Sequence, residues 1–287
     1  MDSIFFYPGG KNKRKIKEWI LSFKPSDVYE YREPFVGGGG VFFAMDKVPV
    51  RWINDMDEKL ISVYLALRDR PEDFIIKCKA IEPHTEGEEQ VPVKATSKIL
   101  CNKRLKELFY DFVNNDSVDP ALRFYFINRL NWNGRVRFEQ SSSMYPSVQI
   151  GWNLVKKGRL ELAAEHMKGV KITNDSYERL LLEPSNGLCW IYCDPPYMVN
   201  TFISQNRKLY THSFAYDDHA KFFDIVSKSP HKVCVSYDDH PDIKKLAESH
   251  DLNIFSKDWF YTGTNLQEDQ KVVAKKQQKE LVITNYK

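Results

Sequence analysis

The chain has 287 residues, of which 42% are hydrophobic and 14% aromatic, and these proportions suffice for a packed core. No run approaches the roughly 18 to 20 apolar residues of a membrane span, and residues 1–15 lack the basic-then-apolar order of a secretion signal. A net charge of +3 is nearly neutral, so overall charge alone does not indicate nucleic acid. We therefore expect a globular, cytoplasmic protein that makes no contact with membranes.

Cysteine spacing and local charge narrow the expected ligands. The five cysteines are an odd number, and they lack the paired CxxC spacing of a zinc site, which predicts reduced, mostly buried thiols and no metal. Basic residues gather in two segments without acids, 94–106 and 120–138. Such segments are commonly solvated helix faces, and nucleic-acid contact is the alternative.

Strand and helix patterns alternate in the first part of the chain. Strands are indicated by short apolar runs bounded by turn-forming residues, and helices by apolar residues that recur at helical spacing. The expected elements are a basic helix over 12–23, a strand over 28–33, four glycines at 37–40, a helix that begins at 41–45, a strand over 50–53 and an amphipathic helix over 60–68.

The same alternation returns towards the C-terminus and predicts the fold class. Alternating strands and helices indicate an α/β protein with a doubly wound, Rossmann-like and mostly parallel sheet. The expected strands cover 170–173, 188–193, 233–236 and 281–284, and the expected helices cover 177–182 and 219–227.

Between these two halves the pattern changes, which predicts a second domain. Helices are expected over 99–113 and 121–130, followed by a stretch rich in Gly, Ser and Asn. We interpret 71–158 as an inserted, mainly helical domain that contains both basic segments. Residues 1–70 and 159–287 then form the other, catalytic domain.

The glycines at 37–40 follow an expected strand, where a doubly wound sheet places its ligand. Asp55 ends the next strand, where an acid commonly accepts hydrogen bonds from ribose hydroxyls, so we predict adenosine recognition. Phe42 replaces the third glycine of a dinucleotide loop, and no Walker lysine follows. S-adenosylmethionine has no pyrophosphate and suits this shorter turn, and a flexible glycine turn beside an acid is the alternative.

The tetrapeptide Asp194-Pro195-Pro196-Tyr197 ends an expected buried strand. Methylation of an exocyclic base amine requires two hydrogen-bond acceptors, which turn the nitrogen lone pair towards the methyl donor. The Asp194 carboxylate and the Pro195 carbonyl, held rigid by the following proline, are candidates for these acceptors. Tyr197 can stack on a base that has left its helix, and an ordinary strand-ending turn is the alternative.

These motifs resemble the Dam-type, DPPY-containing DNA adenine N6-methyltransferases, which depend on S-adenosylmethionine. The resemblance covers nearly the whole chain, with the motifs in the family's order. The matching segments are YPGGK (7–11), EPFVGGGGVFF (33–43), NDMDEKLISVY (54–64), FINRLNWNGRVRF (126–138), DPPY (194–197) and ELVITN (280–285).

The resemblance implies a cofactor pocket and a DNA-contacting hairpin. Methyl transfer leaves S-adenosylhomocysteine as product, and no metal takes part. The implied cofactor residues are Tyr7, Gly9, Gly10, Lys11, Phe35, Gly37, Gly39, Asp55, Asp175 and Asp194. The implied DNA-binding residues are Arg129, Trp132, Asn133, Arg135 and Arg137, with Trp132 in the position of an aromatic that inserts at the base stack.

The leading hypothesis is therefore a site-specific methyltransferase that flips an adenine out of double-stranded DNA. Three alternatives are an RNA adenine N6-methyltransferase, a DNA-binding protein that keeps the cofactor pocket without catalysis, and a protein glutamine methyltransferase. The last is disfavoured because that family's tetrad begins with Asn instead of Asp194. A separately encoded restriction endonuclease is an expected companion, in a bacterium, an archaeon or a phage.

Overall fold

The computed structural model describes residues 3–5, 14–81, 89–92, 100–130, 158–198, 214–261 and 276–287. The chain divides into two compact units. The first unit comprises Met1–Leu21 and Val36–Asp175, and the second comprises Ser22–Phe35 and Ser176–Lys287. Their boundaries differ from the expected insertion at 71–158, because α2 (Glu58–Asp69) packs against α5 (Pro120–Leu130) within the first unit. The insertion therefore stays a prediction.

A seven-stranded, mostly parallel sheet confirms the predicted α/β fold class. Parallel pairing joins β2 to β5, β1 to β6 and β6 to β7, whereas β9 runs antiparallel to both β7 and β8. All five residues of β6 are buried, as expected for an inner parallel strand. In sheet order the strands are β5 (Lys171–Thr173), β2 (Val50–Asn54), β1 (Glu30–Glu33), β6 (Cys189–Cys193), β7 (Lys232–Asp238), β9 (Lys276–Thr284) and β8 (Asn253–Tyr261).

Side-chain caps account for where two of the first unit's helices, α2 and α4, begin. Asp57 caps α2 by accepting the backbone N–H groups of Lys59 and Leu60, and Asn102 caps α4 through the Leu105 N–H. The other elements of this unit are α1 (Arg14–Leu21), α3 (Pro71–Ala80), the hairpin strands β3 (Gln90–Pro92) and β4 (Leu100–Asn102), α4 (Lys103–Asn114) and α7 (Arg159–Met167).

The helix expected to begin at 41–45 is wrong. The chain makes only one 3-10 turn, η1 (Phe42–Ala44), after the glycines. Met45 has extended backbone angles, φ −77° and ψ 145°, and it directs the chain towards β2 after that turn. Phe42 and Phe43 are buried, so the apolar pair that resembled a helix start belongs to the core instead.

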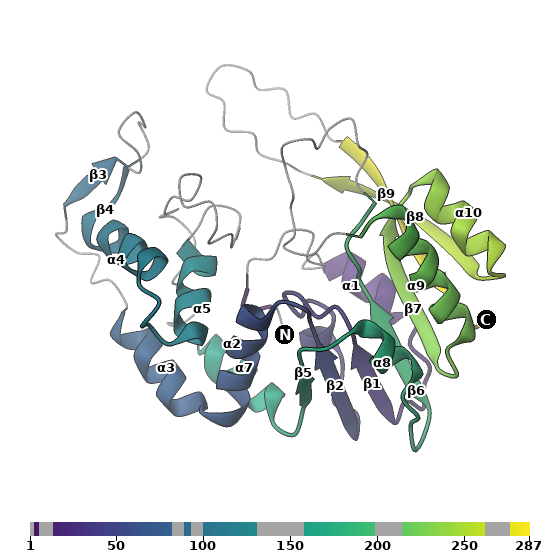
Figure 1. Ribbon diagram of the computed structural model, residues 1–287, viewed down its shortest axis with the longest axis horizontal. Helices are drawn as coiled ribbons and strands as arrows, with labels where there is room; N and C mark the ends of the chain where they lie inside the picture. Colours follow the sequence, from purple (N-terminus) through teal and green to yellow (C-terminus); the bar gives the residue numbers. More distant parts are fainter. Residues whose placement is uncertain are drawn as a thin grey trace. The chain divides into compact units, whose positions relative to one another are not determined.

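The second unit carries α8 (Tyr177–Leu182), α9 (Tyr216–Lys228) and α10 (Pro241–Ser249) alongside its strands (Figure 1). Phe222, Phe223 and Val226 of α9 share one hydrophobic core with Ile191 of β6 and Val235 of β7. The five cysteines of the chain are all buried and free, as predicted. None of the helices that the structure describes combines the length and hydropathy needed to cross a membrane.

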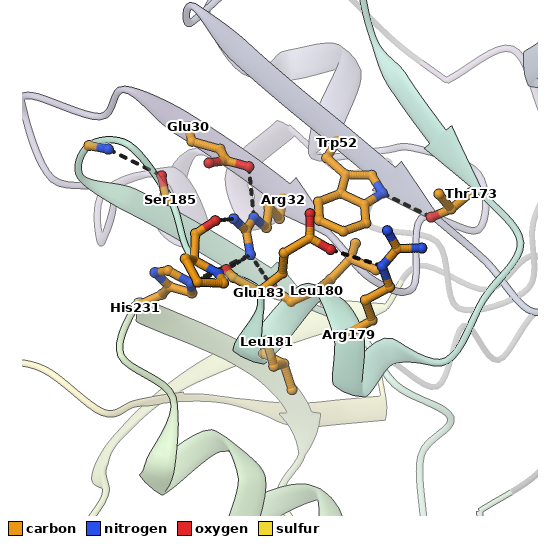
Figure 2. A network of polar contacts seen from close by, with 12 residues as sticks. Glu30, Arg32, Trp52, Thr173, Arg179, Leu180, Leu181, Glu183, Ser185 and His231 are labelled. Atoms are coloured by element: carbon orange, nitrogen blue, oxygen red, sulfur yellow. Dashed lines mark hydrogen bonds and ion pairs between the residues drawn. The ribbon is translucent and has the colours of Figure 1, made fainter.

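A buried arginine ties β1 to the end of α8 in the second unit (Figure 2). The Arg32 side chain is 1% exposed, and its Nε donates to Glu30 Oε1 at 2.8 Å. Its Nη1 donates to the carbonyls of Leu180 and Glu183 at 2.8 and 2.6 Å. A cation suits these carbonyls at a helix C-terminus, and its loss would leave Glu30 buried without this partner, at a cost of about 3–5 kcal/mol.

Candidate active site

In the first unit, four hydrogen bonds hold the glycine loop, residues 37–40, and the residue before it. The Val36 N–H donates to the Asn54 carbonyl at 2.9 Å, and the Gly37 N–H donates to Asp55 Oδ2 at 2.8 Å. The Tyr64 hydroxyl donates to the Gly37 carbonyl at 2.8 Å, and Ser3 Oγ donates to the Gly38 carbonyl. The loop therefore has a fixed shape, which weakens the alternative of a flexible glycine turn.

Two of the glycines are required by the backbone. Gly37 and Gly39 have φ angles of +45° and +66°, in the left-handed region that favours glycine. At Gly39 a Cβ atom would also meet the Tyr64 hydroxyl at 2.8 Å and the Phe43 ring at 3.1 Å. The loop can therefore approach Tyr64 closely because Gly39 has no side chain.

Asp55 and Asp175, both predicted for the cofactor site, lie at the carboxyl ends of neighbouring strands, β2 and β5. Asn54 joins them, because its Nδ2 donates to the Asp175 carbonyl at 2.8 Å while its Oδ1 accepts the Asp175 N–H at 2.9 Å. The Asp55 carboxylate is half-buried and accepts the N–H groups of Gly37 and Asp57. It therefore shapes the glycine loop, and a carboxylate has lone pairs for further donors.

In the second unit, the tip of β6 presents the DPPY residues. Asp194 is half-buried, Pro195 is buried, and Pro196 and Tyr197 are half-buried. Asp194 Oδ1 accepts hydrogen bonds from Ser236 Oγ and from the Tyr197 hydroxyl, both at 2.9 Å. These bonds fix the rotation of the carboxylate, so its second oxygen also has a defined direction.

Tyr197 is held at its hydroxyl and at its ring. The hydroxyl lies 2.7 Å from Glu280 Oε1, and the ring lies 5.5 Å from the Tyr237 ring at an interplanar angle of 31°. Burial, with Asp194 and Glu280 nearby, raises the pKa of Tyr197 well above its usual value. Tyr197 therefore stays neutral, as a residue that stacks on a base and donates a hydrogen bond should.

Phe35 belongs to an aromatic cluster in the second unit. Its ring stacks on Tyr177 with centroids 5.2 Å apart and an interplanar angle of 30°. Phe214 and Phe222 meet its edge at 5.9 and 5.8 Å. Aromatic faces of this kind pack well against a purine ring.

The predicted DNA-binding residue Arg129 lies at the end of α5 and is only 4% exposed. Burial lowers the pKa of its guanidinium to about 10. A buried arginine is an unusual partner for a DNA phosphate, and the assignment stays a prediction. The remaining predicted residues, Tyr7, Gly9, Gly10, Lys11, Trp132, Asn133, Arg135 and Arg137, lie outside the described residues.

Comparison with known proteins decides which chemistry these residues serve. Residues 7–263 match the family of D12 class N6 adenine-specific DNA methyltransferases. The chain belongs to this family.

Relatives of this D12 class chain span bacteria and archaea. The type II methyltransferase M1.LlaDCHI of Lactococcus lactis is 25% identical over 98% of this chain and 94% of its own. The type II methyltransferase M.MjaIII of Methanocaldococcus jannaschii is 26% identical over 94% of this chain and 90% of its own. A DNA adenine methylase of Vibrio cholerae is 24% identical over 78% of each chain.

Membership of the D12 class identifies the protein as a DNA adenine methyltransferase and implies S-adenosylmethionine as its methyl donor. In the first unit, Asp55 provides a half-buried carboxylate beside a fixed glycine loop, which fits the ribose hydroxyls of this donor. In the second unit, taken by itself, Phe35 and Tyr177 provide aromatic faces of the kind that suit a purine. Within the described ranges, no three His, Cys, Asp or Glu side chains group as a metal site.

Four residues that contact the predicted site residues were not themselves predicted from the sequence: Asn54 in the first unit, and Tyr177, Ser236 and Glu280 in the second. Asn54 directly precedes Asp55 at the strand end, and Tyr177 closely follows Asp175, so both had a signal in their position. Ser236 and Glu280 lie 42 residues from Asp194 and 83 residues from Tyr197, and only the pairing of β6, β7 and β9 brings them together.

Proposed function

We propose that the protein transfers the methyl group of S-adenosylmethionine to N6 of an adenine that has been flipped out of double-stranded DNA at a specific site. The observation that carries this proposal is the Asp194 carboxylate at the tip of β6, fixed by Ser236 and Tyr197 in a family of adenine methyltransferases. Such an acid is placed to accept a hydrogen bond from an amine presented beside Tyr197.

The chemistry follows from the weak nucleophilicity of the adenine amine, whose lone pair is delocalised into the ring. Asp194 and the Pro195 carbonyl accept the two N–H groups, which favours a pyramidal nitrogen with its lone pair directed at the methyl group. The bound cofactor supplies this methyl group on a positively charged sulfur. A bond from N6 to carbon forms as the carbon–sulfur bond breaks, and N6 then loses one proton.

The residues take three roles in this proposal: cofactor binding, presentation of the adenine and contact with DNA. Gly37, Gly39, Asp55 and Asp175 bind the cofactor, together with Phe35 and with Tyr7, Gly9, Gly10 and Lys11. Pro196 keeps the Pro195 carbonyl rigid, and Tyr197 stacks on the flipped adenine. Arg129, Trp132, Asn133, Arg135 and Arg137 contact the DNA.

A direct test combines purified protein, duplex DNA and a cofactor labelled on its methyl group. Label should appear as N6-methyladenine, and Asp194→Ala should abolish transfer without unfolding the protein. Asp224→Asn is the matched control, because the side chain of this acid of α9 is 45% exposed and pairs with the solvent-facing Lys228, so the substitution should leave the rate unchanged. Label on cytosine, or no label on any DNA, contradicts the proposal.

The alternatives predict different results in the same assay. An RNA methyltransferase would prefer structured RNA when it competes with duplex DNA. A non-catalytic DNA-binding protein would bind the cofactor without forming product. Preferential methylation of duplex DNA in this competition supports the proposal over the RNA methyltransferase. Formation of product supports it over the non-catalytic DNA-binding protein.

The cellular setting follows from the substrate. We place the protein in the cytoplasm of a bacterium, an archaeon or a phage-infected cell, with a separately encoded restriction endonuclease as companion. The type II names of two relatives support this companion. Sequencing of methylated sites in DNA from a host that expresses the protein tests the proposed companion. Methylation at the mapped site should block cutting by that endonuclease.

A further inference from the structure

A polar cluster within the second unit joins two residues of the DPPY tetrapeptide to buried residues of the neighbouring strands. It consists of Tyr192 and Asp194 from the β6 end, Tyr197, Ser236 from β7 and Glu280 from β9. Tyr192 Oη lies 2.8 Å from Ser236 Oγ, which in turn donates to Asp194 Oδ1 at 2.9 Å. Ser236 is fully buried and Glu280 is 4% exposed, so bulk water does not replace these partners easily.

The hydrogens of this cluster can be counted. Burial raises the pKa of Tyr192 well above its usual value, so its hydroxyl keeps a hydrogen to donate to Ser236. Ser236 can then give its own hydrogen to Asp194. Tyr197 has one hydrogen but lies within hydrogen-bond distance of two carboxyl oxygens, Asp194 Oδ1 at 2.9 Å and Glu280 Oε1 at 2.7 Å. The one hydrogen is therefore shared between Asp194 and Glu280, and the two acceptors together fix the position of the hydroxyl.

We propose that Glu280 is a positioning residue for methyl transfer, which acts by fixing the Tyr197 hydroxyl and through it the Asp194 carboxylate. This inference rests on the proposed roles of Asp194 and Tyr197. With Tyr237 against one face of its ring and Glu280 at its hydroxyl, Tyr197 is restrained at two points. The same contacts then hold Tyr197, which stacks on the base, and Asp194, which accepts the amine hydrogen.

Two substitutions separate this role from simple packing. Glu280→Gln keeps the size of the side chain, and its amide can donate to the Tyr197 hydroxyl while Tyr197 donates to Asp194. Glu280→Ala removes the partner and frees the tyrosine. Since small displacements of catalytic groups slow reactions strongly, we expect the single-turnover rate of methyl transfer to fall about tenfold or more in Glu280→Ala and to stay within about threefold in Glu280→Gln.

The experiment measures single-turnover methyl transfer with labelled cofactor, together with the Kd for cofactor and for duplex DNA. Glu248→Ala and Glu248→Gln are matched controls, because Glu248 is an exposed acid on α10. The Kd for cofactor should change by less than about threefold in every variant, so the loss lies in the rate of the chemical step. Equal rates for Glu280→Ala and wild type, or equal damage in Glu280→Gln and Glu280→Ala, overturn the inference.

A double-mutant cycle shows whether Glu280 acts through the tyrosine hydroxyl. Tyr197→Phe keeps the ring but removes the hydroxyl, so Glu280→Gln and Glu280→Ala should have little further effect in that background. Fully additive losses in the Glu280→Ala cycle contradict the proposal, and where Glu280→Ala unfolds, a loss of more than about threefold in Glu280→Gln contradicts it. A wild-type protein without DNA methylation refutes the proposed function itself, whereas an active wild type with an unaffected Glu280→Ala refutes only the role of Glu280.

Discussion

Replacing Gly39 with alanine perturbs the glycine loop at its tightest point. The φ angle of +66° places this residue in the left-handed region, which costs an alanine about 1–2 kcal/mol. The added Cβ would lie 2.8 Å from the Tyr64 hydroxyl, and moving that hydroxyl breaks its hydrogen bond to the Gly37 carbonyl, worth about 0.5–1.5 kcal/mol. Repacking the Phe43 ring, 3.1 Å from the Cβ, adds about 1 kcal/mol or more.

The expected loss in the free energy of unfolding is therefore about 3–4 kcal/mol. Gly169→Ala is the matched control, because its φ of +71° imposes the same backbone strain, while the described residues place no heavy atom within 4 Å of the added Cβ apart from its chain neighbours. That variant should lose only about 1–2 kcal/mol.

Urea unfolding of the two variants measures this difference, and isothermal titration measures their affinity for S-adenosylmethionine. Gly39→Ala should bind the cofactor about tenfold or more weakly, because the loop that carries Gly37 and accepts Tyr64 must move. Gly169→Ala should bind as wild type does. Equal stability and equal affinity in the two variants would refute the reasoning that the loop's shape depends on Gly39.

Three further predictions concern buried and catalytic polar groups. Asp194→Asn should reduce methyl transfer at least about a hundredfold with little loss of stability, and retained turnover would remove its catalytic role. Asn54→Ala should lower the free energy of unfolding by about 2–4 kcal/mol, because Thr173 and Asp175 lose hydrogen bonds, and urea titration checks this. Burial lowers the pKa of His219 from 6.5 to about 4, so the unfolded chain binds the proton first. Stability should therefore fall by on the order of 1–3 kcal/mol as pH drops from about 6.5 to about 4, less so in His219→Asn, and an identical pH dependence in both proteins would contradict this.

Much of the fold could be predicted from the sequence where local pattern and burial agree. The expected helix over 177–182 coincides with α8, and the expected strand over 188–193 contains β6. In both, turn-forming residues bound a short run that contributes buried side chains to the core: Leu180 and Leu181 from α8, and all five residues of β6. Local pattern therefore suffices for elements in the centre of the fold.

Elements with little burial escaped this reasoning. β8 is an edge strand, and its residues from Phe255 to Asp258 are exposed, so they show no alternation of apolar and polar side chains. Helices α7 and α10 were not predicted either, although Pro241 occupies the first turn of α10. The apolar pair Phe42-Phe43 had the opposite effect, because it led to the prediction of a helix that is absent. Two buried apolar residues after a glycine loop look like the start of a helix in the sequence.

The candidate site was predictable as motifs but not as a network. The residue types of Asp55 and Asp194 and their places at strand ends indicate their roles, because strand ends in α/β sheets carry ligands. No local pattern shows that Asp55 accepts the Gly37 N–H, or that Glu280 reaches Tyr197. Those contacts depend on which strands pair and in which register, and a single sequence does not give that register.

The most direct test of the account is the structure of the protein with duplex DNA and a non-reactive analogue of S-adenosylmethionine. The account predicts an adenine outside the helix, its ring against Tyr197 and its N6 atom about 3 Å from both an Asp194 carboxylate oxygen and the Pro195 carbonyl oxygen. An adenine that stays stacked in the duplex, or an N6 atom that contacts neither acceptor, would contradict it.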